Sequence, residues 1–163
     1  MPFIASWPGK IHPGAVSRAP VLNLDLFPTL LDLTGLGLPG DRIIDGRSIA
    51  ALLLGEAADS PHEAIFFYHY DLLEGMRAGR WKYFRKLNRY TWPIPLDAAT
   101  VPNSLGKSQL GTRWPLLYDL SVDPSESYNV IGTYPNVAEM MHTRLLDWEK
   151  EARENPRGFL TQP

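Results

Sequence analysis

The spacing of apolar residues changes from a helical to a strand-like pattern near residue 60. Before that point apolar residues recur with helical spacing, which predicts a helix over 23–34 and a shorter one over 48–54. Beyond it, runs rich in β-branched and aromatic residues predict strands, and the helical period returns near the carboxy terminus. The predicted strands are 64–70, 75–78, 81–86 and 114–120, and the last helix is 136–154.

The first part of the chain combines one strand with these two helices. A short aromatic run, Phe3–Trp7, predicts the strand, and Pro8-Gly9 ends it. In the helix over 23–34, Asp25 is a candidate cap for the first turn and Gly35 a candidate terminator. Apolar residues cover so much of this helix that we expect it to be buried on more than one side.

The second part predicts a small antiparallel sheet of three or four strands. Gly79-Arg80 separates two of the strands and predicts a hairpin there. The helix over 136–154 is amphipathic, so its apolar face is expected to cover one face of the sheet. The segment 90–111 is rich in Pro, Gly and Asn and is expected to be a long surface loop.

Composition excludes several classes of function. The chain has 163 residues, a formal net charge of -2 and no cysteine. The charge gives no electrostatic basis for binding nucleic acid or a membrane surface. The lack of cysteine excludes disulfides, thiolate metal sites and a cysteine nucleophile. The amino terminus has neither the basic region nor the apolar region of a signal peptide, and no run is long enough to span a bilayer, so the compartment stays undetermined.

Histidine is the natural residue for acid–base chemistry at neutral pH, and the chain has four. His69 ends an aromatic strand beside Tyr70, and strand ends often carry binding groups, so these two residues are the candidates for a ligand site. The other histidines lie in predicted loops or on the last helix and are interpreted as solvated or structural; they are His12, His62 and His142.

Charged residues give no complete site. Asp41 and Asp45 alone supply too few oxygens for calcium, and the carboxylates at 119, 123 and 126 are interpreted as turn-forming groups after a strand. Neither a nucleophile elbow nor a phosphate-binding glycine loop is present. The basic, aromatic segment Arg77–Arg89 either contacts RNA or an anionic sugar, or is the solvated face of the hairpin, which the overall charge favours.

Five segments in register resemble the sulfatase family, and together they span most of the chain. They are Pro2–Ile11, Leu24–Gly35, Ile44–Ser48, Met76–Tyr83 and Leu117–Glu126. Their order and intervals are similar to the carboxy-terminal third of arylsulfatases, including the N-acetylgalactosamine-6-sulfatase-like members.

This resemblance implies an α/β fold built from two parts. Residues 1–58 would form the tail of a large, alkaline-phosphatase-like α/β domain, and residues 59–163 a small domain of about four antiparallel strands packed by the carboxy-terminal helix. Without the rest of the large domain, the strand at Phe3–Trp7 and the helix over 23–34 would expose apolar surface, and we expect that surface to favour oligomerisation.

The resemblance also implies a sulfuric ester hydrolase acting on sulfated sugars or aryl sulfates. The family uses a formylglycine made in a Cys/Ser-x-Pro-x-Arg motif and a calcium ion, and this chain has neither the motif nor matching calcium ligands. The chain alone is therefore predicted to hold no cofactor and to be inactive, with His69 and Tyr70 as candidate substrate contacts. Two alternatives remain open: a phosphoester or phosphonate hydrolase of the same superfamily, and a non-catalytic module that binds a glycan or a protein.

Overall fold

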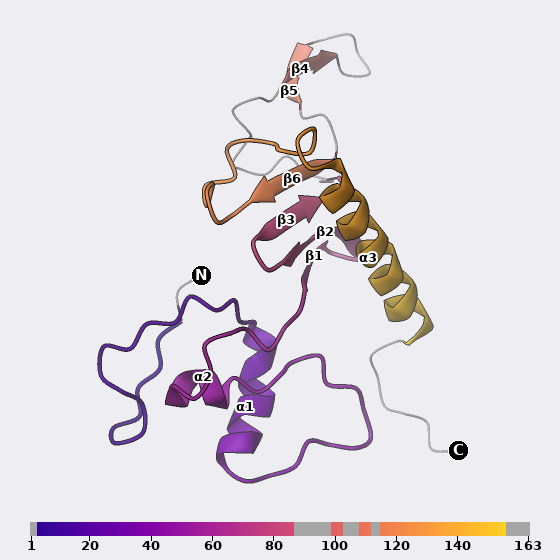
Figure 1. Cartoon of the computed structure of the whole chain (residues 1–163). Helices are drawn as coiled ribbons and strands as arrows, with labels where there is room; N and C mark the ends of the chain where they lie inside the picture. The colour runs from indigo at the N-terminus through magenta and orange to yellow at the C-terminus, as the bar shows by residue number, and fades with distance from the viewer. Residues whose placement is uncertain (1–2, 87–98, 103–107, 112–114, 156–163) are drawn as a thin grey trace. The chain divides into compact units, whose positions relative to one another are not determined.

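The computed structural model describes residues 3–86, 99–102, 108–111 and 115–155 (Figure 1). The chain divides into two compact units. Unit 1 contains residues 1–63 together with 156–163, and unit 2 contains residues 64–155. The assignment of residues 1–58 to a larger domain concerns a longer protein and stays a prediction.

Unit 1 contains three short helical elements in its described part. These are the 3-10 turn η1 (Asn23–Asp25), the helix α1 (Leu26–Leu33) and the helix α2 (Ala50–Leu54). They confirm the helices predicted from apolar spacing. Gly55 follows α2 with φ 77°, the left-handed conformation in which glycine ends a helix without a steric penalty.

The strand predicted at Phe3–Trp7 is wrong. These residues have no regular structure, and no other described segment pairs with them. A strand exists only through hydrogen bonds to a neighbouring strand, so an apolar run without such a partner stays irregular. Phe3 remains 48% exposed.

Helix α1 packs with one face and exposes the other. Pro28 and Thr29 are buried, whereas Leu24 in the preceding turn, Phe27 and Leu30 are 59%, 47% and 63% exposed. Burial on more than one side is therefore not found in unit 1. Apolar residues do lie around most of α1, as the prediction assumed, but the described residues cover only one side of the helix.

Unit 2 is built on a four-stranded antiparallel sheet with a long helix, as the sequence predicts. The sheet has the order β1-β2-β3-β6, and every pairing in it is antiparallel. Its elements are β1 (Ile65–His69), β2 (Leu72–Ala78), β3 (Trp81–Phe84), β6 (Leu116–Asp119) and the helix α3 (Pro135–Glu154).

The core of unit 2 lies between α3 and one face of this sheet (Figure 1). Met76, Tyr83 and Leu117 are register partners on neighbouring strands, so their side chains lie on the same face. Met141 and Leu145 of α3 pack against them and are 1% and 0% exposed. Burying each such side chain contributes roughly 1.5–3 kcal/mol, which makes this layer the main support of the unit.

The segment 90–111 is not a loop throughout. Its described residues include β4 (Ala99–Pro102) and β5 (Ser108–Gly111), which pair with each other in antiparallel register, while residues 90–98 and 103–107 lie outside the described part. Residues that favour turns do not exclude strands of four residues, which is why composition alone misassigned this segment. Among the described residues, no helix has both the length and the apolar character needed to span a membrane.

Candidate functional site

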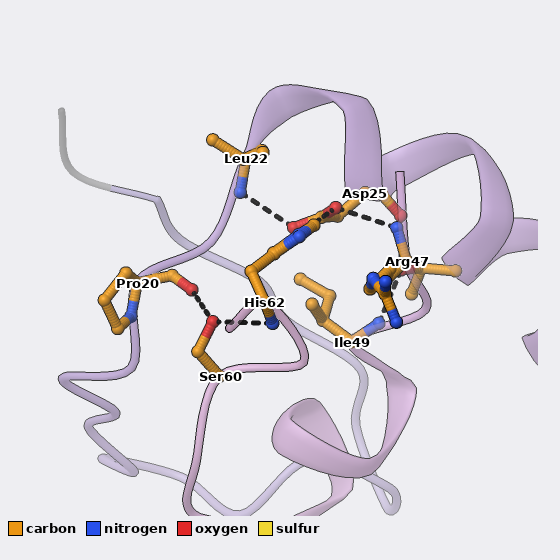
Figure 2. Close-up of polar contacts among 8 residues, drawn as sticks. Pro20, Leu22, Asp25, Arg47, Ile49, Ser60 and His62 are labelled. Atoms are coloured by element: carbon orange, nitrogen blue, oxygen red, sulfur yellow. Dashed lines mark hydrogen bonds and ion pairs between the residues drawn. The ribbon is translucent and has the colours of Figure 1, made fainter. Parts of the chain in front are cut away.

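The most buried charged group in unit 1 is the carboxylate of Asp25. Asp25 ends the η1 turn and is 0% exposed. Its Oδ2 accepts a hydrogen bond from the backbone N–H of Leu22 at 2.8 Å, and its Oδ1 accepts one from the N–H of Arg47 at 2.9 Å. Oδ1 also lies 2.8 Å from Nε2 of His62 (Figure 2). Three donors therefore surround a carboxylate that has no contact with water, as a buried charge requires.

The close approach of residues 46–47 to the η1 turn depends on a glycine. A Cβ built on Gly46 would lie 2.0 Å from the carbonyl oxygen of Leu24, well inside any allowed contact. With hydrogen in place of a side chain, the chain passes close enough for the N–H of Arg47 to reach Asp25.

The hydroxyl of Thr29 links α1 to the start of α2. Thr29 Oγ1 donates to the carbonyl oxygen of Asp25 at 2.5 Å and accepts from the N–H of Ile49 at 2.9 Å. Both Thr29 and Ile49 are buried, so these bonds are shielded from water. The capping role predicted for Asp25 is found in altered form. Its side chain accepts hydrogen bonds from the N–H groups of Leu22, just before η1, and of Arg47, but it makes no capping hydrogen bond to α1.

Ser60 and His62, which follow α2 in the sequence, also join this network. Ser60 Oγ donates to the carbonyl oxygen of Pro20 at 2.6 Å and accepts from the N–H of His62 at 3.1 Å (Figure 2). The side chain of His62 is only 6% exposed. The prediction that His62 is solvated or structural is thus resolved in favour of a structural role.

The hydrogen bonds around Asp25 connect separate segments of unit 1. In the described part of the chain, every buried side-chain nitrogen and oxygen atom has a hydrogen-bond partner. Nor do those residues contain a group of three or more His, Asp or Glu side chains placed to hold a metal. With three donors on the buried Asp25 carboxylate, the network holds chain segments of unit 1 together.

His69 and Tyr70, the residues singled out as substrate contacts, lie at the turn between β1 and β2. His69 pairs with Leu72 across the hairpin, and its ring meets that of Tyr70 edge to face at 4.7 Å. Tyr70 is 83% exposed and has φ 54°, a left-handed conformation that is uncommon for a residue other than glycine. A shift in strand register between Phe67 and Tyr68 precedes this turn.

Strand β1 is tied to helix α3 just before this turn. Phe66 stacks on Trp148 with ring centroids 4.4 Å apart, and the indole N–H of Trp148 donates to the hydroxyl of Tyr68 at 2.8 Å. The turn with the exposed Tyr70 therefore follows a firmly held strand, which is the arrangement expected of a binding loop on a rigid scaffold.

Three of the five basic residues that the structure describes in Arg77–Arg89 form ion pairs within unit 2. Lys82 Nζ lies 2.5 Å from Glu126, Arg85 binds Glu149 through two nitrogens, and Arg80 pairs with Asp119. Of the rest, Arg89 lies outside the described residues. Cations already paired within the chain are poor contacts for an anionic polymer, so the solvated-face interpretation fits this segment better.

The remaining acidic candidates have local roles. Asp119 accepts hydrogen bonds from the N–H and hydroxyl of Ser121, and Asp123 accepts from two backbone N–H groups, at Ser127 and Tyr128. The hydroxyl of Ser121 is the main reason that the pKa of Asp119 lies below its ordinary value. These are the side-chain-to-backbone turns that the sequence predicted.

Asp41 and the two other histidines also have local roles. The guanidinium of Arg42 lowers the pKa of Asp41 by hydrogen bonding to it. His12 is exposed in a loop. His142 Nδ1 lies 3.0 Å from the hydroxyl of Tyr83, whose pKa is raised by burial.

Two family models match the chain, and together they cover nearly all of it. The model described as "N-sulphoglucosamine sulphohydrolase, C-terminal" matches residues 1–92, and "C-terminal region of aryl-sulfatase" matches residues 60–159. Each covers more than half of the 163 residues.

Curated relatives show the same pattern. Human arylsulfatase A is 38% identical over 139 residues, covering 80% of this chain and 26% of that protein. The arylsulfatase of Hemicentrotus pulcherrimus is 37% identical over 139 residues, covering 78% of this chain and 25% of that protein. Mouse steryl-sulfatase is 34% identical over 155 residues, with coverage of 90% and 24%. The chain thus spans about a quarter of the length of these relatives.

Solved structures agree with the fold. A structure from a Bacteroides thetaiotaomicron locus for the metabolism of multiple glycosaminoglycans superposes with TM-score 0.62 at 31% identity, covering 88% of this chain and 28% of that one. A sulfatase from Pseudoalteromonas sp. gives TM-score 0.70 at 20% identity, with coverage of 95% and 30%, which is a likeness of fold alone.

Proposed function

The chain belongs to the sulfatase family, and we propose that it serves as the carboxy-terminal part of a sulfuric ester hydrolase acting on sulfated sugars or aryl sulfates. The observation that carries the proposal is the succession of the two family matches, residues 1–92 and 60–159, both to carboxy-terminal regions of sulfatases. The relatives described above, arylsulfatases and a steryl-sulfatase, are named for sulfate esters.

The residues of this chain do not fit the family's cofactors. Formylglycine requires a Cys/Ser-x-Pro-x-Arg motif, which the sequence lacks. Calcium requires several convergent oxygen ligands, and the described residues hold no group of three acidic or histidine side chains. We therefore propose that the chain contributes no step of the sulfate chemistry and is inactive alone.

The exposed side of α1 supports the proposal that unit 1 is the tail of a larger domain. Leu24, Phe27 and Leu30 present apolar side chains on a helix whose other face is packed. A stable soluble domain seldom leaves such a face uncovered, so its natural cover is further protein surface. In the isolated chain the same face is expected to drive self-association.

Light scattering tests this part of the proposal. Leu30→Lys places a charge on the exposed face of α1 and should shift the isolated chain toward monomer. Val122→Lys is the matched control, because Val122 is 78% exposed but lies in unit 2. A wild-type chain that stays monomeric at high concentration would count against self-association through the exposed face of α1.

The turn bearing His69 and Tyr70 is the part of this chain that we propose to contact substrate. Its two rings are adjacent, Tyr70 is exposed, and its backbone is held in an uncommon conformation next to an irregularity in the sheet. Strained residues and strand irregularities often occur together where a side chain is aimed at a ligand. Aromatic rings suit the apolar faces of a sugar or an aryl group.

The decisive experiment is an assay of the isolated chain with para-nitrophenyl sulfate and added calcium, beside para-nitrophenyl phosphate. We expect no turnover of either ester. Sulfate release that persists through repurification would show a catalytic site within these residues. It would overturn the proposal that the chain contributes no step of the sulfate chemistry.

A chimaera tests the positive half of the proposal. In it, the matching region of human arylsulfatase A is replaced by this chain. We expect a folded chimaera to hydrolyse the aryl sulfate, and Tyr70→Ala to raise KM more than it lowers kcat. A folded chimaera without activity would contradict the proposal, and Tyr128→Ala serves as the control at a second exposed tyrosine.

A further inference from the structure

Unit 2 contains an open pocket between the end of strand β3 and the first half of helix α3. Its volume is about 590 Å³, which lies within the usual range for small-molecule sites. Tyr83 of β3, Pro115 just before β6 and Ala138 of α3 contribute to a lining that is mostly apolar. Neither residue of the turn at His69 and Tyr70 lines this pocket, so it is separate from the substrate contacts proposed above.

We infer that this pocket binds a small organic anion with an apolar body. The body would lie against the apolar lining, and a carboxylate, sulfate or sulfonate group would be held by Lys86 and His142. An apolar pocket with a few polar groups at defined positions is the usual form of a ligand site. All of the lining residues belong to unit 2, and the inference does not depend on the proposed enzymatic role.

His142 supplies a hydrogen-bond donor to the pocket. Its Nδ1 lies 3.0 Å from the hydroxyl of Tyr83, and the two rings meet edge to face at 5.9 Å. Tyr83 is 2% exposed, and its hydroxyl has no second partner among the described residues, so its single O–H donates to Nδ1. The ring proton of His142 is therefore on Nε2, which has no partner in the described part of the chain. An oxygen atom of a ligand can accept from this N–H group.

Lys86 supplies a positive charge that no other described residue neutralises. Its side chain lines the pocket, and it forms no ion pair with a residue that the structure describes. Arg85 differs from it, because two guanidinium nitrogens of Arg85 bind the carboxylate of Glu149. An ammonium group beside apolar surface attracts an oxyanion more strongly than the same group in open water, since the effective dielectric constant is lower there. Lys86 is therefore the charged contact for the ligand.

One carboxylate, that of Glu139, also lines the pocket and opposes an anion. Glu139 is exposed, so water and salt weaken its repulsion. The lining then offers two available donor groups, on Lys86 and on His142, against one available carboxylate, which favours an anion over a cation. The two charges make opposite predictions: removing the charge of Lys86 should weaken binding, and removing that of Glu139 should strengthen it.

Titration of the nitrogen-15-labelled 163-residue chain with naphthalene-2-sulfonate tests the inference. We expect saturable chemical-shift changes at the amides of Ala138, Glu139 and His142, with a dissociation constant of roughly 1 mM or below for a ligand of this size. Naphthalene-2-methanol carries the same rings without a charge and should bind about threefold more weakly or less. Changes confined to the exposed face of α1, or no saturable change in α3, would overturn the site.

Charge variants test whether the ligand is an anion. Lys86→Gln should weaken binding of the sulfonate by about threefold to tenfold and leave that of the alcohol unchanged. Arg77→Gln is the matched control, because Arg77 belongs to the same basic segment, does not line the pocket and makes no ion pair with a described residue. Glu139→Gln should tighten binding of the sulfonate by about twofold. Equal effects of Lys86→Gln and Arg77→Gln, or equal affinities for the two probes, would overturn the anion assignment.

The part of His142 is tested by replacing its ring. His142→Phe keeps an aromatic ring but removes the Nε2 donor, and it should weaken binding of the sulfonate by about threefold or more. It also removes the acceptor of the Tyr83 hydroxyl, so the amide spectrum of the sheet is compared first with that of the wild type. If the sheet is disturbed, Tyr83→Phe with His142 intact is the second variant. It frees Nδ1 without removing the ring of His142 and should retain binding within about threefold. Unchanged affinity in a folded His142→Phe would remove His142 from the site.

Discussion

The α-carbon of Gly46 lies against the backbone of Leu24 so closely that an added Cβ would be 2.0 Å from the carbonyl oxygen. The contact brings two segments of unit 1 together at the point where Arg47 donates to Asp25. No backbone can approach another this closely past a side chain, so glycine is required here for space and not for an unusual φ.

Gly46→Ala should therefore destabilise unit 1. Relieving the overlap requires backbone movement, which costs about 1–3 kcal/mol and weakens the hydrogen bond from Arg47 to Asp25. Gly37→Ala is the matched control, because a Cβ at Gly37 would meet no atom within 4 Å. Exchange protection of α1 and α2 measures the effect. Equal protection in the two variants would show that the approach at Gly46 is readily relaxed.

The local elements of this fold were largely accessible from sequence. The helix at residues 23–33 and α3 follow from apolar spacing, and Gly55 marks the end of α2 by its own backbone preference. Such signals depend on neighbours along the chain. The strand predicted at Phe3–Trp7 failed for the opposite reason, because strand formation depends on a partner that the described residues do not supply.

The Asp25–His62 contact could not be predicted in the same way. The two residues are 37 positions apart in the sequence, and neither belongs to a motif that predicts a contact with the other. The hairpin turn at Tyr70 was also missed, because Tyr-Asp is not one of the glycine- or asparagine-containing pairs that mark a two-residue turn. The strand end and the family resemblance both point to His69 and Tyr70, and their role as substrate contacts stays a prediction.

The core beneath α3 supports a prediction with a control one residue away. Leu145 is 0% exposed, whereas Leu146 is 44% exposed on the same helix. Leu145→Ala should lower the free energy of unfolding of unit 2 by about 2–5 kcal/mol, because it leaves a cavity among Met76, Leu117 and Met141. Leu146→Ala should change it by about 0.5 kcal/mol or less. Urea denaturation followed by tryptophan fluorescence compares them, and similar midpoints would contradict the assigned core.

The ion pair between Arg85 and Glu149 should appear in the pH dependence of stability. Hydrogen bonding to Arg85 lowers the pKa of Glu149 in the folded chain. A carboxyl whose folded pKa is depressed stabilises the fold above its unfolded pKa, about 4.3, and that contribution disappears as the pH falls through the folded pKa.

Glu149→Gln should thus cost stability at neutral pH, by about 0.2–1 kcal/mol for a partly exposed pair, and the difference from wild type should vanish in acid. Glu154→Gln is the control, since Glu154 is 62% exposed and lies 3.9 Å from Lys150. Urea midpoints measured from neutral pH down to about pH 3 give the comparison, because this interval includes the ordinary pKa of a carboxyl group. A deficit of Glu149→Gln that stays constant with pH would mean that ionisation of Glu149 contributes nothing.

Tyr70 allows stability and binding to be separated in one residue. Its φ of 54° is unfavourable for a residue with a Cβ, by about 1–2 kcal/mol, and glycine adopts it without that cost. Tyr70→Gly should therefore raise the free energy of unfolding of unit 2 by up to about 1 kcal/mol, less whatever the ring contact with His69 contributes. Tyr128→Gly should lower it, because Tyr128 is an exposed tyrosine whose φ is not positive. In the active chimaera Tyr70→Gly should weaken substrate binding despite the gain in stability. A variant that gains stability without losing affinity would show that the strained tyrosine at this turn has no part in substrate binding.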